Sequence, residues 1–260
     1  MTNDTASPDG THEQLVAIFT HELCHPLAPI RDAAALLRQD TLDADTIRRA
    51  AEIIERQASD MHRLIGDLLD VSRMQVGALE LRVSRTLLAE LVERAIESAA
   101  PLVRERGHTL HVSVAPDPVY LNIDVLRLSQ ALQNIITNAS KFSGPEGHIH
   151  VRAWREDAVV VIVVCDTGIG IPADEIETIF GLFWRCNHPE GIQPGLGLGL
   201  YLARFLIEAH AGTITAASGG PGCGSVFTIR VPCELSMPLP AESPSWDRTA
   251  SAPEGDPFPA

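Results

Sequence analysis

Apolar residues recur every seven positions between Thr46 and Arg73, and this spacing constrains the fold more than any other feature of the chain. Seven-residue spacing is typical of helices that pack against one another along a shared seam. The residues of the predicted seam are Ile47, Ile54, Met61 and Leu68, with Ala51, Ala58 and Ile65 on the same side. We therefore expect a long helix that buries one side against other helices.

A second run of apolar residues at roughly helical spacing extends from His12 to Leu37. Pro26 and Pro29 should bend this helix, because proline removes a backbone donor and clashes with the preceding turn. A polar turn at residues 39–45 joins the two runs into a helical hairpin. Its apolar stripe is too wide to stay exposed, so we expect a homodimer in which two hairpins form a four-helix bundle. A helical layer packed on the rest of the same chain is the alternative.

From Val76 onward the pattern changes to short alternating runs separated by helical stretches, which indicates an α+β sandwich. The predicted strands are 79–83, 109–115, 119–123, 148–154, 158–166 and 225–231, and the predicted helices are 86–105, 124–142 and 199–210. We expect four segments: a disordered lead-in at 1–11, the helical hairpin at 12–75, the sandwich at 76–232 and a disordered Pro-rich tail at 233–260.

Composition limits the partners. The formal net charge of -14 argues against binding to nucleic acid or to anionic membrane, since both attract Lys and Arg. The five cysteines form no C-x-x-C pair, which favours a reducing compartment over a disulfide framework. No run approaches the roughly 20 apolar residues of a membrane span, and the first ten residues lack the order of a signal peptide. We expect a cytoplasmic protein.

Two glycine clusters have the composition of phosphate-binding segments. Asp166 stands at the end of an apolar strand and is followed by Gly168 and Gly170, which leave the backbone open to a ligand. Gly195 opens a G-x-G-x-G segment that runs into a helix, whose free N–H groups can bind an anion. The spacing matches neither a Rossmann nor a Walker A loop. Each cluster taken alone is equally compatible with structural turns.

A polar stripe precedes these clusters. Asn134 and Asn138 lie four residues apart and share a helix face, and Lys141 continues it. Amide oxygens suit Mg²⁺, a hard cation that also binds phosphates, while lysine supplies a charge for phosphate. A solvated polar face explains one such stripe equally well.

In this order along the chain, these segments resemble the ATP-binding domain of the gyrase/MutL/histidine-kinase superfamily, and its histidine-kinase branch in particular. Upstream, Phe19 to Leu27 (FTHELCHPL) resembles the phosphoacceptor box of the dimerisation domain. The resemblance covers about residues 12–232. Its segments are the N box (134–141), the G1 box (166–170), the F box (180–185), the G2 box (195–200) and a closing stretch at 222–227.

The resemblance implies roles in binding ATP and Mg²⁺. Asp166 would hold the adenine amino group, Asn138 and, less directly, Asn134 would face Mg²⁺ and the phosphates, and Lys141 would contact phosphate. Gly168 and Gly170 would let the nucleotide approach. The remaining implied nucleotide-binding residues belong to the ATP lid, at about 183–193, or to the segment that closes it: Arg185, Gly195, Leu196, Gly197, Leu198 and Gly199.

The resemblance also implies that His21 accepts the γ-phosphoryl group and passes it to an aspartate of a response-regulator receiver domain. Neutral imidazole is a competent nucleophile near pH 7, and Glu22 is placed to act as general base for the ring proton. Because the ATP domain must then reach His21, we expect a hinge at 73–77. We expect the input signal to come from a separate sensory protein or a sensor region outside these residues.

Two alternatives remain at this point. His21 to His25 spells H-E-x-x-H, a zinc-protease motif, although the metzincin continuation is absent. The second alternative is a signalling scaffold that binds ATP and phosphorylates nothing. His25 stands where the family commonly has Asn or Thr, which leaves phosphatase activity open. The other histidines, at 62, 108, 111, 148, 150, 188 and 210, are expected on the surface or at strand flanks, with no ligand geometry.

Overall fold

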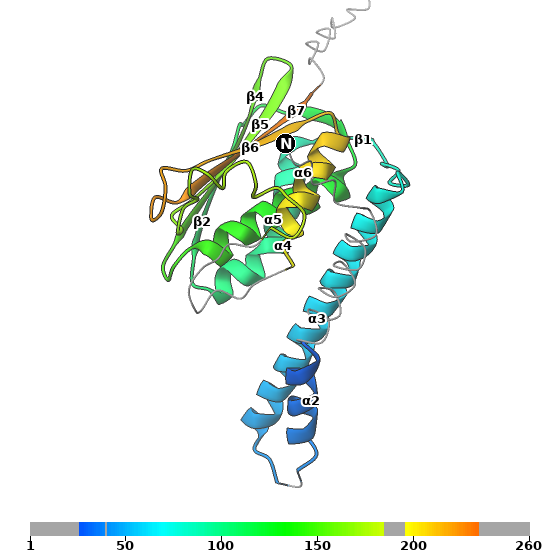
Figure 1. Ribbon diagram of the computed structural model, residues 1–260, viewed down its shortest axis with the longest axis vertical. Helices are drawn as coiled ribbons and strands as arrows, with labels where there is room; N and C mark the ends of the chain where they lie inside the picture. Colours follow the sequence, from blue (N-terminus) through cyan, green and yellow to red (C-terminus); the bar gives the residue numbers. More distant parts are fainter. Residues whose placement is uncertain (1–25, 40, 185–195, 234–260) are drawn as a thin grey trace, which may run out of the picture.

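A computed structural model describes residues 26–39, 41–184 and 196–233 (Figure 1). The expected lead-in, the His21 box, most of the lid and the tail lie outside these residues. The first described elements are two helices, α2 (Leu27–Leu36) and α3 (Ala44–Gln75), which pack as a hairpin. Asp43 begins α3 by accepting a hydrogen bond from the Thr46 N–H at 2.6 Å, which satisfies an otherwise unpaired donor. Pro29 lies in the first turn of α2, where its missing N–H costs little.

The predicted seam of α3 is only partly covered in the single chain. Ile54, Met61 and Leu68 are half-buried, whereas Ile47 and Ile65 are 47% and 44% exposed. Farther along the helix, Val71 and Met74 are buried in the same cluster as the core of the following domain. The far end of α3 is thus packed on that domain, while an apolar row nearer its start remains accessible.

The second domain is built on a five-stranded sheet in the order β2-β4-β5-β7-β6. The strands are β2 (Thr109–Val114), β4 (His148–Glu156), β5 (Val159–Asp166), β6 (Thr213–Ala217) and β7 (Ser225–Pro232). The β2–β4 pair is parallel and the other pairs are antiparallel. A separate antiparallel pair joins β1 (Ser84–Leu87) to β3 (Tyr120–Ile123).

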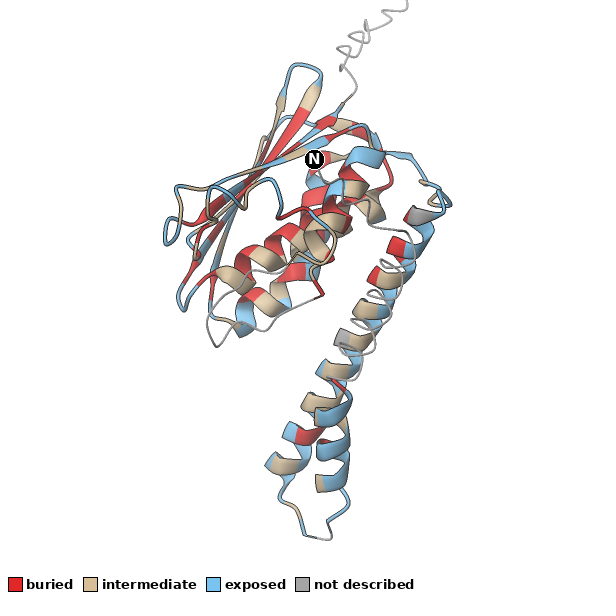
Figure 2. Ribbon diagram, viewed as in Figure 1, coloured by how far each residue is buried: buried red, intermediate tan, exposed pale blue. Residues whose placement is uncertain are grey.

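Helices α4 (Leu88–Glu105), α5 (Val125–Phe142) and α6 (Gly199–Ala209) cover one face of this sheet (Figure 1). The buried positions of the strands and helices face one another across this layer (Figure 2). Ile135 and Ile136 of α5 and Ile149 of β4 are fully buried, and each such side chain contributes about 1.5–3 kcal/mol. The observed architecture is the predicted α+β sandwich preceded by a helical hairpin.

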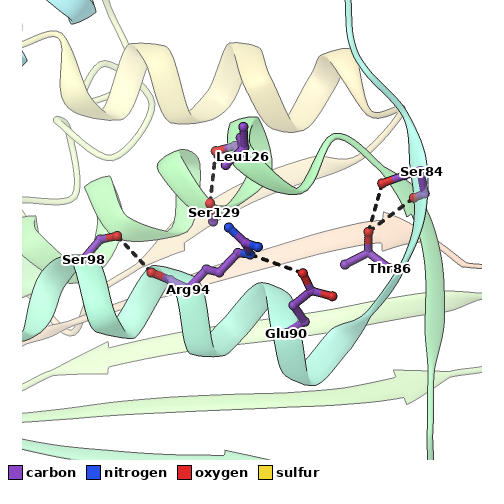
Figure 3. Close-up of polar contacts among 7 residues, drawn as sticks. All are labelled: Ser84, Thr86, Glu90, Arg94, Ser98, Leu126 and Ser129. Carbon is purple, nitrogen blue, oxygen red and sulfur yellow. Dashed lines mark hydrogen bonds and ion pairs between the residues drawn. The ribbon is translucent and has the colours of Figure 1, made fainter.

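Short-range polar contacts order the entry into the helical layer (Figure 3). The Ser84 and Thr86 hydroxyls lie 3.4 Å apart at the strand that leads into α4. On α4, Arg94 donates to Glu90 at 3.2 Å. On α5, the Ser129 hydroxyl donates to the Leu126 carbonyl at 3.0 Å. The two helical contacts are one-turn contacts on exposed faces, so they support the helices locally and leave the apolar faces to the core.

Two histidines expected on the surface or at strand flanks have structural roles. His108 is buried, with Nδ1 2.9 Å from the Ser140 hydroxyl and Nε2 2.9 Å from the Gly144 carbonyl. Because a carbonyl only accepts, Nε2 carries the proton and Nδ1 accepts from Ser140. His210 accepts the Asp124 N–H through Nε2 at 3.0 Å, and its Nδ1 donates to the Leu206 carbonyl at 2.7 Å. Each ring ties the end of one element to another, a role that single-residue patterns do not reveal.

Apart from shifts of one or two residues at other ends, the elements differ from prediction in three places. Residues 79–83 form no strand, because the Arg82 N–H donates to the Asp124 carboxylate at 2.9 Å instead of to a neighbouring strand. The strand begins at Ser84, and the helix predicted from Thr86 consequently begins at Leu88. Strand β6 was not predicted.

Helix α3 is attached to the second domain by ion pairs. Arg127 at the start of α5 donates to the Asp70 carboxylate at 2.7 Å, and Gln130 donates to the same oxygen at 3.1 Å. Asp70 is 5% exposed, so this pair is screened less than a surface pair. Nearer the start of α3, Arg56 lies 3.5 Å from Glu105 at the end of α4.

Among the described residues, no helix combines the length and the apolar composition needed to cross a bilayer.

Asp67, one turn before Asp70, should make stability depend on pH. Burial raises its pKa from 3.8 to about 6, Arg63 opposes this, and the negative charge of Asp70 adds to it. A carboxyl group with a higher pKa in the folded state binds its proton more tightly there. The free energy of unfolding therefore falls as the pH rises from about 4 to 6, by at most about 3 kcal/mol, and levels off above.

Asp67→Asn should raise the unfolding midpoint of the full chain at pH 7.5 and raise it much less at pH 4.5, as measured by urea denaturation. Glu52→Gln, at an exposed position of the same helix, is the matched control and should shift neither midpoint. An equal shift at both pH values would contradict the assignment.

Candidate functional site

Helix α5 brings the predicted N-box residues next to the start of α6. The Asn134 amide donates to the Gly199 carbonyl at 3.3 Å. A side-chain carbon added at Gly199 would lie 3.8 Å from the Asn138 amide nitrogen and 3.9 Å from Asn134. Both amides therefore lie against the N-terminus of α6, where free backbone N–H groups and the helix dipole favour an anion.

Asp166 ends strand β5 and is held by three donors. The Gly168 N–H and the Ser225 N–H donate to Oδ1 at 2.8 and 3.2 Å, and the Ser225 hydroxyl donates to Oδ2. Ser225 is the register partner of Asp166 on β7, so the sheet itself places this hydroxyl. The carboxylate is thereby oriented, and a lone pair of Oδ2 stays available for a ligand donor.

The G1 glycines permit contacts that no other residue would allow. A Cβ at Gly168 would overlap the Phe142 carbonyl oxygen, and one at Gly170 would overlap the Gly220 carbonyl oxygen. Gly170 also has a φ of 73°, which favours glycine. These positions bring the loop after β5 against the end of α5 and the turn before β7.

A cavity of about 490 Å³, including its open mouth, lies between these segments. Its walls are mainly apolar, with Ile169, Ile171, Trp184 and Phe227 among them, and its polar groups come from Asn138, Asp166, Glu175 and Ser225. Within the described part of the chain, Glu175 Oε2 is buried without a hydrogen-bond partner. An apolar slot with a few convergent polar groups suits a flat ring that carries an amine.

The G2 segment contributes backbone rather than side chains. Leu196 and Leu198 are 4% and 2% exposed and belong to the hydrophobic core. Any ligand contact they make must therefore pass through the main chain. Gly197 has a φ of 69°, and a Cβ there would lie 2.5 Å from the Trp184 carbonyl oxygen.

The structure brings together much of the predicted set. Asn138, Asp166 and Gly170 line one cavity, and Asn134 and Gly199 adjoin it. Lys141 follows on α5 but is not among the residues that line this cavity. His21, Glu22, Arg185 and Gly195 lie outside the described residues. The sequence did not point to Ser225 or Glu175 as site residues. Ser225 lies opposite Asp166 only because of how β5 and β7 pair, and no sequence pattern marks Glu175.

In the ranges that the structure describes, no three His, Cys, Asp or Glu side chains converge, in the orientations that they adopt, on a point that could hold a metal ion. The H-E-x-x-H box at 21–25 is not among those ranges.

Comparison with known families identifies both parts of the chain. Residues 11–77 match the His Kinase A (phospho-acceptor) domain. Residues 123–235 match the family described as histidine kinase-, DNA gyrase B- and HSP90-like ATPase, so the second domain is of a type that uses ATP.

Similar proteins carry the same combination. Sensor histidine kinase MtrB of Mycolicibacterium paratuberculosis is 31% identical over 245 residues, which are 89% of this chain and 43% of that protein. Full-length ShkA in complex with AMPPNP has a TM-score of 0.63 at 27% identity, over 86% of this chain and 46% of that one. ThkA in complex with response regulator TrrA has a TM-score of 0.59 at 22% identity, over 85% of this chain and 61% of that one. At this identity the likeness shows the fold alone.

The chain spans about two fifths of the length of MtrB. Neither the scaffold nor the zinc-protease alternative is favoured, because the acceptor-box region and the ATP domain match histidine-kinase families in their usual order. The chain belongs to the two-component sensor histidine kinase family.

Proposed function

We propose that this chain transfers the γ-phosphoryl group of ATP to His21 and then to an aspartate of a response regulator. The observation that carries the proposal is the cavity in which the N box and the G1 box meet. Asn138 and Asp166, 28 residues apart, line it together beside the N-terminus of α6. A region that matches the phosphoacceptor family precedes this cavity in the same chain.

In this proposal the adenine ring enters the apolar slot and its amino group donates to Asp166. The three donors that already hold the carboxylate support this role, because they fix its orientation before the ligand arrives. The triphosphate extends toward Asn138 and the start of α6. Lys141 and Arg185 supply positive charge, and the main chain from Gly195 to Gly199 encloses the phosphates.

Mg²⁺ fits the same end of the site. The amide oxygens of Asn138 and Asn134 are hard ligands of the type that Mg²⁺ accepts, alongside phosphate oxygens and water. When bound, the ion would neutralise charge on the phosphates. The protein's own contribution is to place these amides against Gly199, whose lack of a side chain leaves room beside them.

At the acceptor, a ring nitrogen of His21 attacks the γ-phosphorus. The new N–P bond forms as the bond to the leaving ADP oxygen breaks, and Glu22 takes the ring proton. Transfer to the regulator then exchanges this N–P bond for an acyl phosphate on aspartate. Phosphoryl transfer demands little of the attacking nucleophile. The main requirements are therefore that the reacting atoms are placed in line and that the charge on the phosphates is neutralised.

We further propose a homodimer, with the hairpin at 12–75 and the ATP domain at 76–232. Exposed Ile47, Ile65 and Leu69 on α3 support it, since they leave an apolar row for a second hairpin. The complex of the similar ThkA with a response regulator supports the choice of partner. A separate sensory protein or sensor region supplies the input.

Changing the acceptor should abolish phosphorylation. With γ-labelled ATP and Mg²⁺, the full chain should acquire acid-labile, base-stable label, and His21→Gln should acquire none. His62→Gln, at an exposed histidine of α3, is the matched control and should label normally. ATP binding that persists in an unlabelled wild-type chain would select the scaffold alternative, and label in His21→Gln would exclude this acceptor.

Changing the adenine contact should weaken nucleotide binding. Asp166→Asn replaces an acceptor by an amide whose NH₂ faces the Gly168 and Ser225 donors or the adenine amine. Calorimetry with a non-hydrolysable ATP analogue should show affinity about 10- to 100-fold lower. Asp174→Asn, an exposed carboxylate of the following segment, should bind as the wild type does. Equal affinities for all three proteins would rule out this role for Asp166.

A further inference from the structure

Three histidines lie together on the uncovered face of the sheet. In β4, His148 and His150 are exposed, while Ile149 and Val151 between and after them are fully buried toward the helices. In β2, His111 is likewise exposed. Helices α4, α5 and α6 cover only the opposite face of the sheet (Figure 1), so these imidazoles face outward.

Strand pairing sets their spacing. His111 and His150 are register partners in the parallel β2–β4 pair, and His148 is two residues before His150 on the same face. The ring centroids of His111 and His150 are 4.7 Å apart, and His148 lies 6.1 Å from the first and 6.5 Å from the second. The His111 and His150 rings stack at 15°, so their nitrogens do not yet converge.

Convergence requires only side-chain rotation. The backbone already places His111 opposite His150, His148 two residues before His150, and His148 diagonally across from His111. In each pair, two histidine side chains can reach one metal ion. Exposed rings reorient readily, because the terminal torsion of histidine has a broad energy profile. Imidazole nitrogen is the commonest protein ligand of Zn²⁺ and related ions, with bonds of about 2.0–2.1 Å.

We propose that His111, His148 and His150 form a surface site for a divalent transition metal such as Zn²⁺, bound through three imidazoles with a coordination position left to water. The donor type favours Zn²⁺, Co²⁺ or Ni²⁺ over Mg²⁺ or Ca²⁺, which prefer oxygen. The formal net charge of -14 favours cations in general.

The side chains next to the three histidines do not prevent them from binding one metal ion. Arg152 follows on the same face of β4, but its guanidinium lies over the Trp154 ring at 5.7 Å, toward the far end of the strand. Cys165 is the register partner of His150 on β5, which lies on the opposite side of β4 from β2 and His111. The proposed site, between β2 and β4, therefore does not include the Cys165 thiol.

The proposed metal site is separate from the nucleotide cavity, which none of the three histidines lines. It is nevertheless connected to the G1 loop: Thr167 accepts the His148 N–H through its hydroxyl at 3.0 Å and donates its own N–H to the His148 carbonyl at 3.2 Å. Metal binding can thus be measured without nucleotide, and its failure would not affect the proposed kinase function.

The test is zinc titration of the tag-free, metal-free full chain at pH 7.5 by calorimetry, without nucleotide. One ion should bind per chain at this site. His111→Asn and His150→Asn should each weaken that binding at least about tenfold, since a direct ligand matters at least as much as the groups that orient it. Retained ATP binding would show that these surface variants are folded.

Two controls separate this site from other histidines. His62→Asn should keep the site, and His21→Gln should keep it too, which excludes the H-E-x-x-H box as its source. With Co²⁺ in place of zinc, visible absorption should appear without a thiolate charge-transfer band. Unchanged affinity in both His111→Asn and His150→Asn, absence of binding, or a thiolate band would overturn the proposal.

Discussion

The close approach of three main-chain segments behind the cavity is the constraint on which the site depends. The loop after β5 passes the end of α5 and the turn before β7 so closely that only hydrogen atoms fit at Gly168, Gly170 and Gly224. The segments are joined directly, with the Ile169 N–H donating to the Phe142 carbonyl at 3.0 Å and the Gly224 N–H to the Gly168 carbonyl at 3.0 Å. Asp166 inherits its position from this contact. A side chain at any of the three glycines would push these segments apart. The Asp166 carboxylate would then be displaced even in the absence of a ligand.

The periodic parts of the fold were predictable from local patterns. The seven-residue spacing in α3 and the alternation in β4 each reflect a face that must be buried, and such faces can be read without knowing the partner. Strand ends and helix faces placed Asp166, Asn138 and Gly170 individually, and the resemblance to the histidine-kinase ATP domain grouped them into one site. The strand expected at 79–83 failed for a non-local reason, since the Asp124 carboxylate, 42 residues from Arg82, takes the hydrogen bond that a strand would need.

The parts that escaped prediction depend on contacts between distant segments. Ser225 becomes part of the site only because β7 pairs with β5 in one particular register. His108 and His210 become structural because their rings meet a hydroxyl, carbonyls or an N–H on other elements. Likewise, the i,i+2 spacing of His148 and His150 was visible in the sequence, but the position of His111 beside them required the β2–β4 pairing.

Helix α5 contacts both the helical hairpin and the candidate nucleotide site. Its first turn holds α3 through Arg127 and Asp70, and its later turns carry Asn134 and Asn138 against α6. Eleven residues separate Arg127 from Asn138, which is about 16 Å along a rigid helix. A movement of the ATP domain that separates Arg127 from Asp70 would leave an almost fully buried carboxylate without its partner, which is costly unless Asp70 is rehydrated or finds another partner. The docked arrangement is therefore a distinct state of the domain pair, and the proposed nucleotide site lies on the same helix that maintains it.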